Sequence, residues 1–220
     1  MHPLRQRTEP PTIAEIEEEW RRRARRTGLG PVMRASQPAE LAPAVTAATR
    51  GQVAGHLDRL SVLLGRPLRS ALEIGCGIGR LTPTIAATAE RVLAVDMTEE
   101  MLARARVACA GLGNVEFQRR TAQRLAIPES RVDVAVCVWV LMHVLDDAEF
   151  AAACRGIARS AAHLVLVEYT DAAVPVGRYS RLRSLADYLD ALPGARLVER
   201  GELCYGGDVS FSALIALDQP

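Results

Sequence analysis

The sequence predicts an α/β domain in which helices cover both faces of a mostly parallel sheet. Short runs of apolar and β-branched residues alternate with helical patterns over residues 70–168, and this alternation is typical of a doubly wound sheet. The first run leads directly into a loop with glycine at alternate positions. After residue 168 the alternation stops, and two further runs have Gly206-Gly207-Asp208 between them. That spacing indicates a hairpin, which makes the last strand antiparallel.

Seven strands follow from this pattern. Five are expected at 70–74, 91–95, 115–119, 132–136 and 163–168, and the hairpin adds 195–203 and 209–217. Helical patterns fill most intervals, at 80–89, 98–112, 148–160 and 180–192. The interval 121–131 is the exception, because it is rich in loop-forming residues and shows no helical repeat.

The chain ahead of the first strand is also predicted to be helical. Thr12 and Glu15 have the spacing of a capping box. The helix that follows carries an apolar stripe of Ile13, Ile16, Trp20 and Ala24. Its acidic run 17–19 lies four residues before the basic run 21–23, the order that favours ion pairs within a helix. A second helical region is expected at 39–64.

We divide the chain at residue 50. Residues 1–50 are expected to form an N-terminal helical cap, and residues 51–220 the main domain. A chain of 220 residues suits one such domain and can bury a sizeable core without a metal or a disulfide.

Charge argues against nucleic acid and anionic membranes as partners. The 27 basic and 26 acidic residues give a net charge of +1, so no overall field attracts a polyanion. The arginine-rich run to Arg26 is better explained as a solvated helix face paired with its own glutamates than as a nucleic-acid patch. The longest apolar stretch, 132–145, is interrupted by Asp133 and His143 and is shorter than the ~20 residues that a membrane-spanning helix needs.

The cysteines predict reduced thiols. Five of them are scattered through the chain without a C-x-x-C pair, which argues against a disulfide framework and against a zinc site. Residues 1–11 are polar and lack the features of a signal peptide. We therefore expect a cytoplasmic protein with no metal.

The glycine loop is the most informative motif. A buried run ending at Ile74 continues into Gly75, Gly77 and Gly79, and a helix starts at once. Without side chains the backbone can approach a ligand, and the free N–H groups of the helix start face it. The NAD fingerprint needs its third glycine where Arg80 stands, so that cofactor is excluded.

Two acidic residues accompany the loop. Glu73 lies two residues before Gly75, and Asp96 lies 21 residues after it, at the end of the second β run. A carboxylate at that strand tip can accept hydrogen bonds from both hydroxyls of a ribose. A tight turn and a helix N-cap are the simpler explanations of the glycines and of Asp96, but they leave the combination unexplained. The combination indicates a nucleoside-containing cofactor.

With these motifs the chain resembles the class I S-adenosylmethionine-dependent methyltransferases, particularly their small-molecule group. The resemblance covers roughly residues 51–217 and is sharpest at 72–80 and 92–97. It implies a Rossmann-like methyltransferase fold, S-adenosylmethionine as cofactor, and direct in-line methyl transfer to a small acceptor of the secondary-metabolite kind. In related enzymes the N-terminal segment often closes over the active site, and we expect the same here.

The resemblance implies roles for residues around the first two strands. Glu73 stands where the family's acid orders the loop and the methionine amino end. Gly75, Cys76, Gly77 and Gly79 stand where the floor under methionine and ribose is formed. Asp96 is expected to hold the ribose diol, and Met97 to pack on adenine. Two plainer roles stay open: Cys76 as a small apolar filler, and Met97 as ordinary core.

Later positions depart more from the family's pattern. Thr121 stands where the family often has an aspartate that accepts from the adenine amino group, so that contact is not implied here. The backbone N–H of Ala122 is still expected to meet the adenine ring. Cys137 and Val138 stand where backbone groups contact the methionine end. His143 follows the fourth strand and has a suitable pKa for a general base, although a capping or packing role is an alternative. Trp20 and Trp139 are candidate walls of the acceptor pocket.

The sequence fits methylation of nucleic-acid bases less well. The segment after the fourth strand begins Cys137-Val138-Trp139-Val140 and lacks the Asn/Asp-Pro-Pro-aromatic loop of enzymes that methylate the amino groups of nucleic-acid bases. Methylation of a protein or peptide side chain stays open, as does a non-methylating protein that keeps the cofactor fold as a scaffold. The acceptor, the acceptor atom and the oligomeric state stay open too, with a homodimer among the alternatives.

Overall fold

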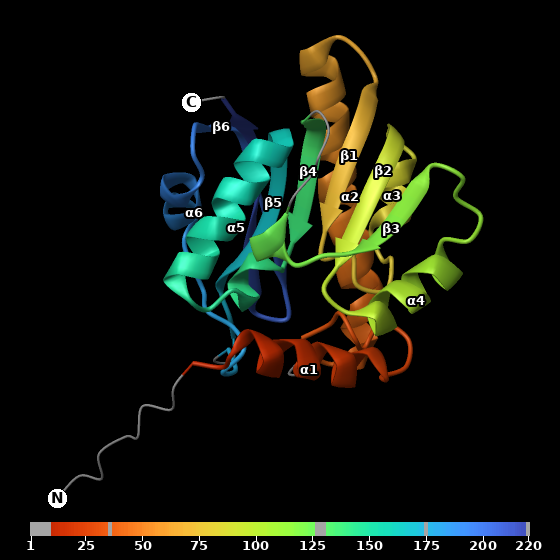
Figure 1. The fold of residues 1–220 in the computed structure, drawn as a ribbon, viewed down its shortest axis with the longest axis vertical. Helices are drawn as coiled ribbons and strands as arrows, with labels where there is room; N and C mark the ends of the chain where they lie inside the picture. Colours follow the sequence, from red (N-terminus) through yellow and green to blue (C-terminus); the bar gives the residue numbers. More distant parts are fainter. Residues whose placement is uncertain (1–9, 35–36, 126–130, 174–175, 219–220) are drawn as a thin grey trace, which may run out of the picture.

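A single twisted sheet with helices on both faces forms the protein (Figure 1). The computed structural model describes residues 10–34, 37–125, 131–173 and 176–218. The strand order is β3-β2-β1-β4-β5-β7-β6. All pairings are parallel except those of β7, which runs antiparallel to both β5 and β6. The predicted doubly wound, mostly parallel sheet with an antiparallel last strand is confirmed.

All seven predicted strands are present. They are β1 (Leu68–Ile74), β2 (Ala89–Asp96), β3 (Val115–Arg119), β4 (Val132–Val138), β5 (Ala161–Asp171), β6 (Ala195–Tyr205) and β7 (Asp208–Leu217). The β6–β7 turn consists of Gly206 and Gly207, which both have positive φ angles, and this is the backbone geometry that a tight two-residue hairpin requires.

The helices agree with the sequence pattern except at some ends. They are α1 (Ile13–Ala24), α2 (Ala42–Leu64), α3 (Thr82–Ala86), α4 (Glu99–Ala108), α5 (Asp147–Ser160) and α6 (Leu185–Ala191). Short 3-10 turns η1 (Ala39–Leu41), η2 (Ala122–Arg124) and η3 (Leu141–His143) complete the set. The prediction of a helix from residue 180 was wrong: Ser184 and Asp187 form a capping box, so α6 begins only at Leu185. The interval 121–131 holds η2, and residues 126–130 lie outside the described part.

Two apolar cores lie on opposite faces of the sheet. On one face α2 and α3 pack on β1, β2 and β4 through Val53, Leu57 and Ile85. On the other face α5 and α6 pack on β4, β5 and β7 around Ile157 and Tyr188. Because β1 pairs with both β2 and β4, the chain order reverses at β1. In an open α/β sheet, ligands bind in the crevice at the carboxyl ends of the strands beside such a reversal.

Helix α1 lies across those carboxyl ends (Figure 1). Its predicted capping box is present, with the Thr12 hydroxyl accepting from the Glu15 N–H at 3.3 Å and the Thr12 N–H donating to the Glu15 carboxylate at 2.8 Å. Its three central arginines, 21–23, all pair with glutamates 17–19 of the same helix. The basic run up to Arg23 is therefore a self-paired helix face, as the sequence indicates.

Helix α2 runs through the position at which the sequence was divided. The boundary between residues 50 and 51 therefore lies inside a helix, and the cap as a separate unit stays a prediction. Most of the segment 1–11 lies outside the described residues. Within the described ranges no helix is both long and apolar enough to cross a membrane.

Candidate functional site

A pocket lies at the carboxyl ends of β1, β2 and β4, where the chain order reverses. It has a volume of about 1000 Å³ including its mouth, which is enough for a nucleoside together with a small molecule. Ile16 and Trp20 of α1 and Val32 also line it, so the N-terminal segment contributes to the pocket. Ten of the predicted site residues line it: Glu73, Gly75, Cys76, Gly77, Asp96, Met97, Thr121, Ala122, Val138 and His143.

The glycine loop forms the pocket floor because a side chain would not fit. Gly75 has a φ of +69°, and a Cβ on it would overlap the side chain of Val140. Val140 belongs to the segment that follows β4, so the two loops touch directly across the end of the sheet. A bare backbone at Gly75 is therefore required both by its left-handed conformation and by this close approach.

Two predicted site residues do not line the pocket. Gly79, with a φ of +79°, faces α4, where a Cβ would come within 2.9 Å of the Cys109 sulfur and 3.2 Å of the Ala105 Cα. Its glycine is explained by helix packing. The side chain of Cys137 is fully buried in the core beneath β4. Contact of either residue with a cofactor stays a prediction.

Asp96 links the second strand to the glycine loop. Its carboxylate accepts from the Gly77 N–H at 3.0 Å and, through the other oxygen, from the Thr98 N–H at 3.0 Å and the Thr98 hydroxyl at 3.2 Å. Burial raises the pKa of Asp96, although these hydrogen bonds oppose the shift. The carboxylate is thus held against the loop, at the edge of the pocket where a ribose is expected.

Glu73 lies deeper, at the end of β1. It is 3% exposed, and its carboxylate accepts from the Thr82 hydroxyl at 2.6 Å. Burial raises the pKa of Glu73 to about 7, while the hydrogen bond from Thr82 and the nearby positive charge of Arg80 lower it. Glu73 can therefore carry or release a proton near neutral pH, and it connects the pocket to the start of α3.

The segment that follows β3 lines the pocket next to the end of β2. Arg120, Thr121, Ala122 and Gln123 all line the pocket, facing Met97 at the end of β2. The Arg120 N–H donates to the Asp96 carbonyl at 2.9 Å, which holds this segment beside β2. Thr121 occupies the position predicted for adenine contact, although which atoms contact a base stays a prediction.

A buried carboxylate shapes the turn after β4. Trp139 has a φ of +54°, a conformation that is unusual for a bulky residue and is often found at functional sites. The next two N–H groups, of Val140 and Leu141, donate to the Glu168 carboxylate at 3.0 and 2.7 Å. Burial raises the pKa of Glu168 to about 8. Arg183 donates to the carbonyls of Leu141 and Val144 at the same turn.

His143 ends this turn and faces the pocket. Its Nδ1 lies 2.7 Å from the Tyr179 carbonyl, and since a carbonyl only accepts, Nδ1 carries the proton and Nε2 keeps a lone pair. The Trp20 ring packs edge-on at 4.8 Å between ring centres. Burial lowers the pKa of His143 to about 4, so the imidazole is neutral at physiological pH.

Several site residues were missed by the sequence interpretation. Glu168, Tyr169 and Asp171, at the end of β5, do not line the pocket. Glu168 and Arg183 instead hold the η3 turn, and no local pattern indicated it. Arg80 was used only to exclude NAD, yet it lines the pocket. Among the described residues no group of three or more His, Cys, Asp or Glu side chains is placed to hold a metal.

Comparison with known proteins agrees with this geometry. Residues 71–163 match the family model described as "Methyltransferase domain". The segment includes the glycine loop, Asp96 and the η3 turn. It therefore covers the elements that build the pocket floor.

Two curated relatives share about a third of their aligned residues with the chain. Phosphoethanolamine N-methyltransferase 1 of Caenorhabditis elegans is 30% identical over 141 residues, covering 62% of this chain and 29% of that protein. The ubiquinone biosynthesis O-methyltransferase of Methylococcus capsulatus is 32% identical over 140 residues, covering 60% and 54%. The chain thus spans well under two thirds of the length of either relative.

A solved structure shows the same fold over nearly the whole chain. The N-methyltransferase NodS from Bradyrhizobium japonicum, in complex with S-adenosylhomocysteine, has a TM-score of 0.72 at 19% identity and covers 92% of this chain and 99% of its own. The matched family model, the fold shared with that structure and the glycine-floored pocket all agree with the resemblance of the chain to the class I S-adenosylmethionine-dependent methyltransferases.

Proposed function

We propose that the protein binds S-adenosylmethionine and transfers its methyl group in line to a small-molecule acceptor. The observation that carries the proposal is the contact between Asp96 and the glycine loop. A buried carboxylate is held by the Gly77 N–H at the edge of a pocket whose floor includes the bare backbone of Gly75 and Gly77. A carboxylate can accept about four hydrogen bonds, so Asp96 has accepting capacity left for a ribose hydroxyl.

The pocket residues have two proposed tasks, namely to hold the cofactor and to align its methyl group with the acceptor. Asp96 would hold the ribose, the 75–77 backbone would lie under the ribose and the methionine, and Met97 and Ala122 would flank the adenine. When bound, S-adenosylmethionine supplies an activated methyl group, so the main task of the protein is alignment. Correct alignment can supply about 7–11 kcal/mol in favourable cases.

His143 is the proposed general base for an acceptor that must lose a proton. The bond to Tyr179 fixes its tautomer, so the Nε2 lone pair is available at neutral pH. A pKa of about 4 makes it a weak base, which suits an acceptor already activated by its neighbours better than a free alcohol. Positioning of the acceptor by the imidazole ring is the alternative role.

The acceptor class is part of the proposal. The relatives named above carry N- and O-methyltransferase names, and a pocket closed by Ile16 and Trp20 suits a small molecule better than a polypeptide. Methylation of a peptide side chain is the second candidate, favoured if the arginine-rich face of α1 proves to bind one. A cytoplasmic location, a homodimer and the absence of nucleic-acid, membrane and metal partners stay predictions.

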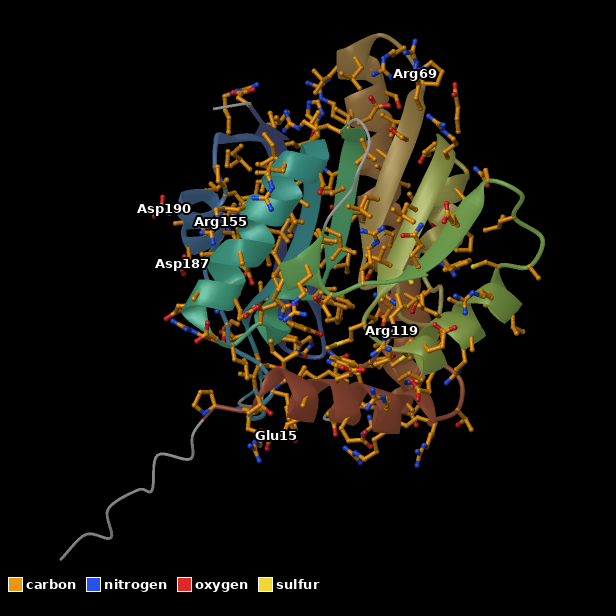
Figure 2. The ribbon with its side chains drawn as sticks, in the orientation of Figure 1. Glu15, Arg69, Arg119, Arg155, Asp187 and Asp190 are labelled. Atoms are coloured by element: carbon orange, nitrogen blue, oxygen red, sulfur yellow. The ribbon has the colours of Figure 1, made fainter. Side chains whose placement is uncertain are left out.

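Calorimetric titration tests the proposal. We expect S-adenosylmethionine and S-adenosylhomocysteine to bind the wild-type protein and the affinity to fall about tenfold or more in Asp96→Ala, because a charge-assisted hydrogen bond is lost. Asp190→Ala is the matched control, since Asp190 is exposed on α6, far from α1 (Figure 2). A folded wild-type protein that binds neither compound would refute the proposal. Binding without release of S-adenosylhomocysteine from any trial acceptor would favour the scaffold alternative.

A further inference from the structure

Arg80 places a guanidinium group in the pocket without a carboxylate partner among the described residues. The residue is only 7% exposed and lines the pocket. Its Nη1 atom is buried and makes no hydrogen bond. Among the described residues no carboxylate oxygen lies within 4.0 Å of its nitrogens. Arg80 follows the glycine loop directly, so this unsatisfied cation lies beside the pocket floor and not on the protein surface.

The guanidinium lies on the β4 side of the pocket. Its central carbon is 5.1 Å from the ring centre of Trp139, and the Trp139 ring in turn stacks on Tyr169 at 5.3 Å. The backbone is fixed as well, because Arg50 donates two hydrogen bonds to the Arg80 carbonyl, at 3.0 and 2.8 Å. The cation is therefore pre-positioned on an aromatic surface, on the opposite side of the glycine loop from Asp96.

A buried positive charge in this position is unfavourable unless a ligand supplies a counter-charge. Burial lowers the pKa of Arg80 to about 10, so the group stays protonated at neutral pH. Leaving a buried charge without a hydrogen-bonded counter-charge is costly. Tyr205 and, after it, the carboxylate of Glu73 act to raise the pKa of Arg80. The Glu73 carboxylate is bound by Thr82, and its own pKa of about 7 leaves it only partly ionised.

A second buried arginine shows how the chain treats a purely structural guanidinium. Arg183 is 6% exposed. It donates to the carbonyls of Leu141 and Val144 at 3.2 and 2.8 Å and lies 3.9 Å from the ring centre of Phe150. Two arginines of equal burial thus differ in one respect: the one outside the pocket is satisfied by the protein, and the one inside it is not.

We propose that Arg80 binds a carboxylate of the small molecule that occupies the pocket, with Trp139 against the apolar part of that molecule. A guanidinium fork matches the geometry of a carboxylate. The carboxylate has two sources, namely an acidic acceptor and the methionine end of S-adenosylmethionine. The inference rests on the proposed function for the identity of these sources, but the presence of an anion site does not depend on it.

Thermal unfolding without ligand tests whether Arg80 is structural. Arg80→Met removes an unpaired buried charge at similar volume, so we expect a melting temperature equal to or above that of the wild type. Arg183→Met is the matched control, and we expect it to lower the melting temperature by several degrees, because two buried carbonyls lose their donor. A loss in Arg80→Met as large as that in Arg183→Met would overturn the proposal.

Calorimetry then distinguishes the sources of the carboxylate. Wild type and Arg80→Met are titrated with S-adenosylmethionine and with decarboxylated S-adenosylmethionine. If the cofactor supplies the carboxylate, Arg80→Met weakens S-adenosylmethionine about tenfold or more and leaves the decarboxylated compound unchanged. Benzoate, with benzamide as its neutral control, is titrated with and without S-adenosylhomocysteine. If the acceptor supplies the carboxylate, wild type binds benzoate at least about tenfold more tightly than Arg80→Met does.

Either pattern supports the proposal and names the source. Equal binding of all four compounds by wild type and Arg80→Met would overturn it. The wild-type protein could bind benzoate but neither adenosyl compound, with benzoate binding lost in Arg80→Met. That result would refute the proposed function and still support the anion site. The two failures are therefore separable.

Discussion

At the scale of single residues, the site is built from polar groups whose surroundings set their protonation. Burial raises the pKa of Glu73 to about 7 and lowers that of His143 to about 4. Both groups are therefore neutral over ranges in which the free side chains would be charged. For His143 the bond from Nδ1 to the Tyr179 carbonyl leaves the lone pair on Nε2.

Two substitutions of His143 separate chemistry from positioning. We expect His143→Ala to lower kcat about 10²-fold or more with the best trial acceptor, while the Kd of S-adenosylhomocysteine stays within a few-fold. Asn can still donate to the Tyr179 carbonyl from the place of Nδ1, but it has no group at Nε2. If His143 acts as a general base, we expect the turnover of His143→Asn to be as low as that of His143→Ala, measured by release of S-adenosylhomocysteine. Recovery of turnover in His143→Asn would contradict the base and assign His143 to positioning.

At the scale of elements, one arginine of α4 fastens the end of α1 to the main domain. Arg104 donates to the carbonyls of Ala24, Arg26 and Gly28 at 2.8, 2.6 and 3.0 Å. A second tie joins Arg119, at the end of β3, to Glu17 at 2.5 Å, and Arg119 points toward α1 (Figure 2). Since α1 supplies a wall of the pocket, these bonds connect cap docking to ligand binding.

Arg104→Met tests the docking of the cap. Three charge-assisted hydrogen bonds are lost, so we expect hydrogen exchange in α1 to rise about tenfold or more while exchange in the sheet is unchanged. Arg106→Met is the control on the same helix, because Arg106 pairs mainly with the exposed Glu99. Deleting residues 1–45 is a less clean test, because α2 begins at Ala42 and would be truncated. Unchanged α1 exchange in Arg104→Met would show that other contacts hold the cap.

The order of elements could be predicted from the sequence, because each strand and helix has its own local period. The same is true of the pairing of Asp96 with the glycine loop, since parallel strands end at one edge of the sheet. The hydrogen bonds by which Glu168 and Arg183 hold the η3 turn could not be predicted. Glu168 and Arg183 lie 27 and 42 residues from Leu141, and neither has a sequence signature. The left-handed Trp139 and the orientation of Arg80 likewise depend on tertiary contacts, and a single sequence contains no pattern for those.

At the scale of the whole molecule, the stability of the fold depends on pH in two opposite ways, one due to buried acids and the other due to buried histidines. The raised pKa values of Glu73 and Glu168 mean that the folded state binds more protons than the unfolded state from about pH 4.5 to 7 or 8. Stability from these groups therefore falls as the pH rises. The lowered pKa values of His56 and His143 act in the other direction up to about pH 6.5. Above that pH only the acids remain.

We therefore expect the free energy of unfolding to decrease between pH 6.5 and 8. The slope for one such proton is at most about 1.4 kcal/mol per pH unit. Glu168→Gln keeps an acceptor for Val140 and Leu141 but cannot ionise, so it should flatten the slope in urea unfolding measured across this range. Glu90→Gln is the control, because Glu90 is exposed. A slope in Glu168→Gln equal to that of the wild type would assign the pH dependence to other groups.

The two tryptophans of the chain lie on different walls of the pocket, Trp20 on α1 and Trp139 after β4. Each therefore serves as an intrinsic optical reporter of one event. With Trp139→Phe the remaining emission follows the seating of the N-terminal helix, and with Trp20→Phe it follows filling of the cleft beside Arg80. Stopped-flow recordings on the two single-tryptophan proteins would show which event comes first when a ligand enters.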